Sequence, residues 1–362
     1  MNLLKQCLLF ILILGFFTSC AKGDSSLDNQ KLTAVYDPAA LAMGKADEVQ
    51  VLRQIPPKVM QWLAKTGKPD STGMTGRNKS QGWIHVAFQR TGMRNLLYSI
   101  VQEDTVGVRN GWSVIDAAFS RQKEDGSFEL GTFKGQTPKY KDNLSGTAFW
   151  IAELSYTLLV LEKSNIHGGF DADIEALKPK IKKAAYWLKD GKDALYAMDA
   201  HAPNRLFYDA LAFGLAGTLV DDPHLRSLSA EFANQGLSLQ DASGVFLEKS
   251  KKSGKMGFDS SYQAVSVLNL ARYTRFFPNP EASRALARGV QWELNRILPS
   301  GEITVEGNSR TGQGQEELLG RKKDIDYPAV LLALFYDGFA NHDPQSHQGA
   351  LKVAEFVARK LE

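Results

Sequence analysis

Cysteine is almost absent from this chain of 362 residues: Cys7 and Cys20 are the only two, and both lie close to the N-terminus. A domain that follows them has no thiol, which excludes a disulfide framework, a cysteine zinc site and a thiol nucleophile. An excess of one charge is also lacking, because 43 lysines and arginines face 40 aspartates and glutamates. A net charge of +3 is too balanced to argue for nucleic acid or for an electrostatic grip on a membrane.

Sequence motifs for common cofactors are missing as well. The chain has no glycine-rich nucleotide loop, no nucleophile elbow and no paired histidines at metal-ligand spacing. We therefore expect neither a metal nor a cofactor.

Residues 1–20 have the composition of an export signal. Lys5 gives the positive start, residues 8–17 form an apolar run too short to span a bilayer comfortably, and small residues precede Cys20. The segment resembles a bacterial lipoprotein signal peptide. This resemblance implies cleavage after Ser19, lipidation of Cys20, for example with palmitate, and a place in the bacterial cell envelope, with the outer membrane favoured. An ordinary secretory signal or an N-terminal anchor is the alternative.

The rest of the chain divides into a tether and a domain. Residues 21–46 begin with a polar stretch that suits a flexible tether. Residues 47–362 are long enough for one large domain or two ordinary ones. Turn glycines at intervals of 65, 53 and 57 residues favour one repetitive domain, and they are Gly126, Gly191, Gly244 and Gly301.

Two kinds of helix alternate along this repeat. One kind opens with Asp-Pro or Asn-Pro, as at Asp222, Asn279 and Asp343, and has one polar face, which predicts outer helices. An equivalent run that contains Pro179 should kink or start late. The other kind is apolar or small nearly all round, which predicts an inner ring at residues 83–100, 146–161, 206–220, 262–277 and 327–339. We expect an all-α fold, an incomplete α/α barrel of about five inner and six outer helices, present as a monomer.

Connections of unequal length distinguish the two ends of such a barrel. Inner-to-outer links are short, whereas the outer-to-inner links are long and should all emerge at one end: residues 123–143, 191–204, 241–258 and 300–325. The inner-helix N-termini face the same end with their unpaired N–H groups. A funnel built in this way prefers anionic or hydroxyl-rich ligands.

The segment from Gln122 to Phe128 resembles the glutamine-and-aromatic turn of α/α-toroid proteins such as the triterpene cyclases, where the turn is structural. We expect the other turns to keep little of it beyond the glycine. The organisation of residues 47–362 is also similar to incomplete-toroid polysaccharide lyases of the alginate lyase kind. Tyr208 and Asp209 match a Tyr-Asp of those lyases, but Pro203-Asn204 replaces the catalytic Asn-His pair.

Candidate site residues follow from their position at the funnel. Tyr208, Tyr262 and Tyr327 fall near the starts of inner helices, where a ring can stack on sugar or pack in the core. We expect Tyr262 or Tyr208 to act as acid or base, with assistance from His201; His85 also reaches the funnel. For Asp259 and Asp326, capping of the helix that follows is a better explanation than ligand binding. The expected substrate-binding residues are Asn204, Arg205, Asp259, Gln263, Arg310, Asp326 and Tyr327.

Three functions remain open from the sequence. The leading one is an exported, lipid-anchored protein that acts on or binds a polysaccharide or oligosaccharide, as a lyase by β-elimination. The second is a non-catalytic glycan- or protein-binding lipoprotein, which the missing Asn-His pair favours. The third is a glycoside hydrolase with two carboxylates drawn from Asp259, Glu306, Glu316 and Asp326.

Lipidation can be tested directly. Cys20→Ala should release the protein from membranes or leave an uncleaved precursor, because a lipoprotein signal is processed at its cysteine. Cell fractionation and the mass of the mature chain are the measurements, and Cys7→Ala is the matched control that should leave both unchanged. Normal processing and membrane partitioning of Cys20→Ala would contradict the lipoprotein hypothesis.

Overall fold

The structure is a computed structural model that describes residues 48–53, 55–132, 135–249, 254–309, 317–318, 321–322 and 325–360. The expected signal and tether, including Cys20, lie outside these residues. The described part is mostly helical, and its strands occur as two short antiparallel pairs, so the prediction of an all-α fold is confirmed. The pairs are β1 (Glu248–Lys249) with β2 (Met256–Gly257), and β3 (Glu317–Leu318) with β4 (Arg321–Lys322).

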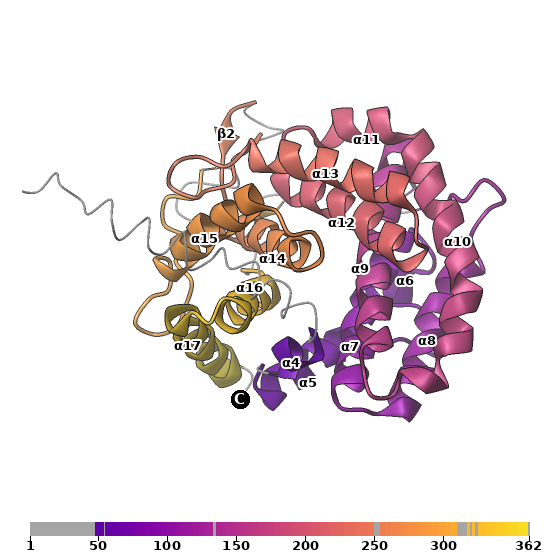
Figure 1. The fold of residues 1–362 in the computed structure, drawn as a ribbon, viewed down its shortest axis with the longest axis horizontal. Coiled ribbons are helices and arrows are strands. Elements are labelled where there is room, and N and C mark those ends of the chain that lie inside the picture. Colours follow the sequence, from indigo (N-terminus) through magenta and orange to yellow (C-terminus); the bar gives the residue numbers. More distant parts are fainter. Residues whose placement is uncertain are drawn as a thin grey trace, which may run out of the picture.

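The helices form a ring in two layers (Figure 1). The inner layer contains helices whose residues are buried nearly all round, and each packs against the next. These are η1 (Val86–Thr91) with α7 (Gly92–Val101), α9 (Tyr140–Glu162), α12 (Pro203–Leu219), α14 (Ser260–Phe276) and α16 (Tyr327–Ala340). The outer layer contains α5 (Pro57–Gly67), α8 (Thr105–Phe119), α10 (Asp171–Asp190), α13 (Pro223–Leu237), α15 (Pro280–Leu294) and α17 (Pro344–Lys360). This packing is compatible with an α/α toroid.

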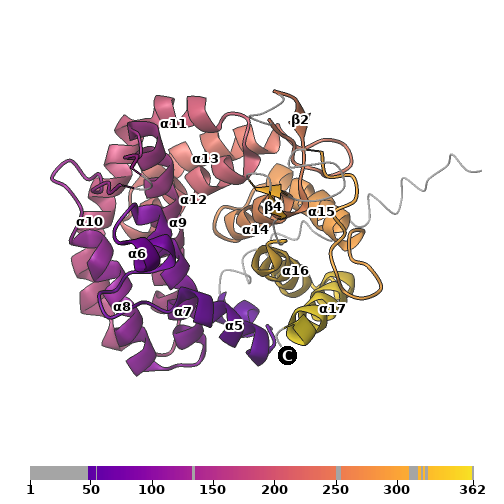
Figure 2. The ribbon, with the colours of Figure 1, turned by 180° about the vertical axis from the view of Figure 1, so that it is seen from behind.

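A short helix that the sequence did not predict lies where the ring meets itself. Helix α4 (Glu48–Arg53) contacts both α7 and α16, the first and last of the long inner helices (Figure 1). Seen from behind, α6 (Gly76–Gln81) and β4 lie in front of the ring, and both belong to links from an outer to an inner helix (Figure 2). This end of the ring therefore carries the long links, as expected.

Three local expectations need correction. Helix α9 begins at Tyr140, earlier than predicted. Helix α10 starts at Asp171 and runs through Pro179, so the late start is wrong. The link 191–204 is not a loop, because it contains helix α11 (Lys192–Asp199), which buries Leu195 completely.

The turn glycines share one geometry, which explains why they are glycine. Gly126, Gly244 and Gly301 have φ of +93°, +94° and +90°, in the left-handed region that glycine tolerates best. A Cβ at each would also lie 2.3 Å from a backbone carbonyl oxygen on the next outer helix, on α10, α15 and α17 respectively. Each turn is therefore seated on the outer helix that follows it.

The set of glycines that form these turns differs from the prediction at two positions, Gly73 and Gly191. Gly73 has φ +77°, and a Cβ there would lie 2.2 Å from the carbonyl oxygen of Ser113 on α8. Gly191 has φ −91° and leads directly from α10 into α11, so it does not form such a turn. Assigning Gly191 to the repeat was therefore wrong, because spacing alone does not report backbone conformation.

The glutamine of the toroid-like turn is also repeated, contrary to expectation. The amide nitrogen of Gln122 donates to the carbonyl oxygens of Gly126 (3.3 Å) and Lys180 (2.9 Å). Gln240 does the same with Gly244 (3.1 Å) and Ala285 (2.8 Å). Backbone bridges from Gln122 to Phe128, Gln240 to Phe246 and Ile297 to Ile303 close the three turns, and the second residue of each bridge is buried.

Helix α9 is long and apolar enough, by composition, to cross a membrane. Most of its apolar stretch is buried against other helices of the ring. Of the described helices with at least 18 residues it is the one that meets this test, and its burial is that of a core helix.

Replacing a turn glycine should destabilise the ring strongly. Gly244→Ala combines left-handed strain with a clash against the backbone of Arg288, and we expect it to lower the free energy of unfolding by about 3 kcal/mol. Gly254→Ala is the matched control: its φ is +68°, but no atom lies within 4 Å of the new Cβ, so only about 1 kcal/mol should be lost. Denaturant titration measures both, and equal losses would contradict the seating of the turn.

Candidate functional site

A cavity of about 380 Å³ opens at the end of the ring where inner helices begin, and we name it the entrance cavity. Its walls come from the start of η1, from the residues before and within the first turns of α9, and from the first turn of α12. The polar residues among its lining include His85, Arg90, Asp142, Ser145 and Arg205. The cavity lies within the volume range of small-ligand sites.

Two aromatic rings and an arginine connect this cavity to the middle of the ring. The rings of Phe149 and Tyr208 are 4.8 Å apart, centroid to centroid. The guanidinium of Arg90 lies 5.0 Å from the ring centre of Phe149 and 6.0 Å from that of Tyr208. Cation–π contacts of this kind hold a guanidinium over an aromatic face without using its N–H donors.

Tyr208 also lines a second, smaller cavity of about 60 Å³, which we name the axial cavity. Its lining comes from α4, α5, α7, α9, α12, α14 and α16, so it lies at the centre of the ring. Most of this lining is apolar. The polar exceptions are Arg94, Glu153, Tyr208, Arg272 and Asp326.

Buried ion pairs fill the space beside the axial cavity. Glu153 accepts hydrogen bonds from Arg272 (2.9 Å) and from the hydroxyl of Tyr208 (3.1 Å). The Arg272 guanidinium lies 4.3 Å from the ring centre of Tyr156. One helical turn further along, the Tyr156 hydroxyl donates to Glu48 (3.1 Å), which also pairs with Arg275.

Burial and neighbouring charges shift the pKa values of Glu153 and Tyr208 in opposite directions. Burial raises the pKa of Glu153, but the charge and hydrogen bond of Arg272 outweigh it and hold the pKa below its usual value. Burial raises the pKa of Tyr208 well above its usual range, and the Glu153 carboxylate adds to the effect. The Tyr208 hydroxyl is therefore a proton donor at neutral pH and not a base.

Arg90 and Arg94 are functional candidates that the sequence analysis missed. Both are half-buried, and within the described part of the chain neither guanidinium makes a hydrogen bond or an ion pair. Both are close enough to Glu153 to lower its pKa. The available signal was their i, i+4 spacing on a helix predicted to be surrounded by others, which places two cations on one inward face.

Three of the predicted site residues lie at these cavities. Tyr208 and Asp326 line the axial cavity, and Arg205 lines the entrance cavity. Asp326 also caps α16 by accepting from the backbone N–H of Ala329 at 3.3 Å. The Arg205 guanidinium donates to Asp199 at 3.1 Å.

Several other predicted residues have structural contacts elsewhere. Buried Asp259 caps α14 by accepting from the N–H of Tyr262 at 2.8 Å, and Tyr262 lines neither cavity. The Gln263 amide accepts from the N–H of Phe246 (2.8 Å) and donates to the carbonyl of Gly244 (3.1 Å), so it holds a glycine turn.

The remaining predicted residues are placed away from the cavities or are not described. Buried Tyr327 packs at a tilt against Phe356 of α17, with ring centroids 5.5 Å apart. Asn204 is buried, and its side-chain oxygen accepts from the N–H of Arg205. His201 is exposed and lines neither cavity. Arg310 lies outside the described residues.

A buried carboxyl pair lies behind Arg205. Asp199 and Asp209 are both fully buried, on α11 and α12. Burial raises the pKa of Asp209 well above its usual value, and the nearby Asp199 charge raises it further. Asp209, the residue matched to the lyase Tyr-Asp, is therefore buried near Arg205 and does not line either cavity.

No protein-family model and no curated protein matches this chain. Among the described residues, no group of three histidine, cysteine, aspartate or glutamate side chains is arranged to hold a metal ion.

His85 lines the entrance cavity as a neutral imidazole. Its Nδ1 accepts a hydrogen bond from the N–H of Ala87 at 3.1 Å, which places the proton of the neutral ring on Nε2. Burial lowers the pKa of His85 to about 4. The ring packs so closely on α9 that a Cβ at Gly146 would lie 1.6 Å from its Cε1. In this state His85 can donate a hydrogen bond but cannot serve as a base.

The pKa of His85 predicts a pH dependence of stability. The folded pKa of about 4 lies below the ordinary value of 6.5, so between these values the unfolded chain binds more protons. Stability present above pH 6.5 is therefore lost as the pH falls toward 4, by about 3 kcal/mol. His85→Gln should remove this loss, measured as the difference in unfolding free energy between wild type and variant at each pH.

A second variant provides an internal check of opposite sign. Burial raises the pKa of Asp337 from 3.8 to about 6, so the folded protein binds its proton first and gains stability as the pH falls through this window. Asp337→Asn should lack that gain. A pH dependence in His85→Gln equal to that of wild type would contradict the neutral, buried imidazole.

Proposed function

We propose that this protein binds an acidic saccharide in the entrance cavity and that Arg90 and Arg94 recognise its carboxylate. The observation that carries the proposal is the pair of half-buried guanidiniums, one helical turn apart, with no hydrogen-bond acceptor among the described residues. A guanidinium has five N–H donors in a fixed fork that matches a carboxylate. Polar donors that stay unused at a cavity indicate that a ligand supplies the acceptor.

The surroundings support a sugar in preference to a flat apolar ligand. The exposed part of the Phe149–Tyr208 pair offers an aromatic face to a sugar ring, and Arg205 offers donors to its hydroxyl groups. At about 60 Å³ the axial cavity is too small for a sugar ring, so the ring belongs in the entrance cavity and only a small group reaches toward Arg94.

Binding without catalysis is the version that these residues support best. β-Elimination needs a base to remove a proton next to the carboxylate while the leaving oxygen takes up a proton. Tyr208 carries the proton that the second role needs, but its raised pKa makes it a weak acid. A base is harder to assign: Arg272 lowers the pKa of Glu153, which makes that carboxylate a weak base, and the Nε2 of His85 is buried.

A polysaccharide lyase is the second candidate, and Tyr208 is the observation that favours it. A tyrosine hydroxyl beside two arginines provides an acid and a carboxylate clamp in one place. Glycoside hydrolysis has less support, because the two carboxylates brought together, Glu153 and Asp326, meet in a cavity too small for a sugar.

The family and cellular setting belong to the same proposal. The two-layer ring and the repeated glutamine turns at Gln122 and Gln240 support membership of the α/α-toroid superfamily. The N-terminal sequence supports export as a lipoprotein anchored through Cys20 in a bacterial envelope. We propose a monomer that meets its saccharide outside the cytoplasm, without a cofactor and without nucleic acid.

Calorimetric titration with short uronate oligosaccharides tests the proposed function. Arg90→Gln with Arg94→Gln should weaken binding by about tenfold to a hundredfold, the cost of losing hydrogen bonds between charged groups. Arg226→Gln, on the outer helix α13 and outside both cavities, is the control and should leave affinity unchanged. Absence of binding to uronate oligosaccharides by the wild-type protein would overturn the proposal.

The same samples separate the two candidates. Absorbance of an unsaturated product that disappears in Tyr208→Phe supports the lyase. Binding without product supports the non-catalytic protein.

A further inference from the structure

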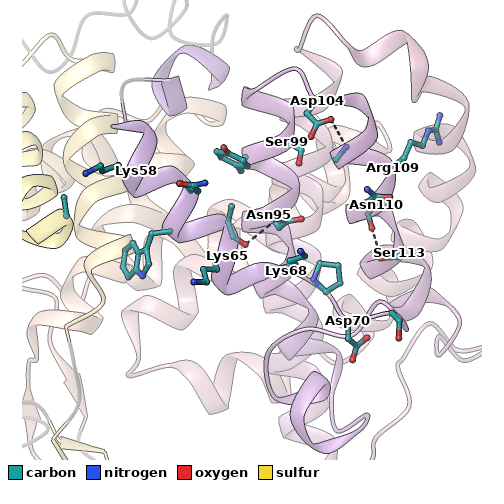
Figure 3. Close-up of a pocket in the computed structure, with 18 residues that line it drawn as sticks. Lys58, Lys65, Lys68, Asp70, Asn95, Ser99, Asp104, Arg109, Asn110 and Ser113 are labelled. Carbon is teal, nitrogen blue, oxygen red and sulfur yellow. Dashed lines mark hydrogen bonds between the residues drawn. The ribbon is translucent and has the colours of Figure 1, made fainter. Parts of the chain in front are cut away.

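A second polar depression lies on the outer surface of the ring, and we name it the outer groove (Figure 3). It has a volume of about 1230 Å³, roughly three times that of the entrance cavity. Its long wall is α5, its floor is the outward side of α7, and its opposite wall is the first half of α8.

The outer groove and the axial cavity use opposite sides of α7. Asn95, Tyr98 and Ser99 line the groove, whereas Arg94 and Leu97 line the axial cavity. Because α7 is packed between them, a ligand in the groove does not touch the arginines of the proposed site. The groove is therefore separate from the site described above.

Cationic side chains outnumber acidic ones in the lining of the groove. The cationic lining residues are Lys58, Lys65, Lys68 and Arg109, and the acidic ones are Asp70 and Asp104. Both aspartates are occupied by their own backbone, Asp70 by the N–H groups of Thr72 and Met74 and Asp104 by that of Gly107.

Two of the four cations are available to a ligand. Arg109 pairs with Asp173 on α10. Lys65 and Lys68 are exposed, and neither makes an ion pair with another residue that the structure describes. Figure 3 shows both on the same wall of the groove, beside Asn95.

The rest of the lining consists of aromatic rings and amides. Trp62 and Tyr98 are half-buried and present part of their rings, and the amide side chains are Gln61, Asn95 and Asn110. Rings that stack on sugar faces, together with amides that pair with hydroxyl groups, are suited to a hydroxylated ligand. Lysines spread along the groove are suited to an acid that repeats along a chain.

We propose that the outer groove binds an extended strand of an acidic polysaccharide, at a site separate from the entrance cavity. The class of polymer rests on the proposed function, but the groove residues and their contacts do not. A long open trough with two available lysines on one wall, beside aromatic rings and amides, fits an extended acidic chain better than a single small anion. Nucleic acid is disfavoured, because the net charge of the whole chain is only +3.

Affinity electrophoresis in gels that contain polygalacturonate or alginate tests this site. Lys65→Ala with Lys68→Ala should reduce retention by about threefold to tenfold, as expected for two exposed ion pairs, and the remaining retention should depend less on salt. Both side chains are exposed, so folding should be unaffected. Lys163→Ala with Lys183→Ala removes the same charge outside the groove and should leave retention unchanged.

A substitution that leaves the net charge unchanged distinguishes recognition of sugar hydroxyl groups from electrostatic attraction. Asn110→Ala should also reduce retention on the acidic polymer. Binding of short uronate oligosaccharides, measured by calorimetry, should stay unchanged in both groove variants and fall only in the Arg90 and Arg94 variant.

The outcomes distinguish the two proposals. Retention that the Lys65 and Lys68 variant keeps, or that the control variant loses equally, would overturn the groove, and so would equal retention on single-stranded DNA. If the wild-type protein does not bind uronate oligosaccharides, the proposed function is overturned. Polymer retention that depends on Lys65, Lys68 and Asn110 would still support the groove in that case.

Discussion

The ring depends on a set of charges buried at its centre. Glu48 with Arg275, and Glu153 with Arg272, join helices that are up to 227 residues apart in the sequence, and Tyr156 touches both pairs. Removing charge from water is costly, and losing one partner of a buried pair costs about 3–5 kcal/mol. The two ion pairs therefore favour one relative placement of α4, α9 and α14, because the charges are paired only when the ring is assembled correctly.

The same central charges shape what the site can do. Arg272 and the Tyr208 hydroxyl both donate to Oε1 of Glu153, and neither Arg90 nor Arg94 makes an ion pair with another residue that the structure describes. A cation without a partner at the mouth of an otherwise apolar ring costs stability unless an anion binds there. The acidic ligand proposed above would therefore also stabilise the fold.

Local chemistry made much of the architecture predictable, and tertiary contacts explain the rest. Asp222 and Asn279 cap α13 and α15 as their Asp-Pro and Asn-Pro sequences predicted, because a cap is settled within four residues. Helix α4 has six residues and is placed only by contacts with α7 and α16, which no local pattern reports.

The site was less predictable than the fold, because one residue type serves several purposes. Asp259 and Gln263 have side chains suited to sugar binding, yet the first caps a helix and the second holds a turn. The spacing of Arg90 and Arg94 was visible in the sequence, but only the structure shows that they lie at the cavities without an acidic partner among the described residues. Tyr208, Asp326 and Arg205 were predicted correctly to lie near the cavities, because each lies at the start of an inner helix. That position alone does not predict which side chains line a cavity.

The glycine turns give the ring a direction. Each of these turns follows one outer helix and packs against the next outer helix, so it joins neighbouring hairpins in chain order. The turns are those at Gly73, Gly126, Gly244 and Gly301. Between α10 and α13, helix α11 takes the place of such a turn. Because each turn contacts only the adjacent hairpin, the turns fix which hairpins are neighbours, whereas the central ion pairs fix how the first and last hairpins meet. Order around the ring and closure of the ring are therefore controlled by different residues.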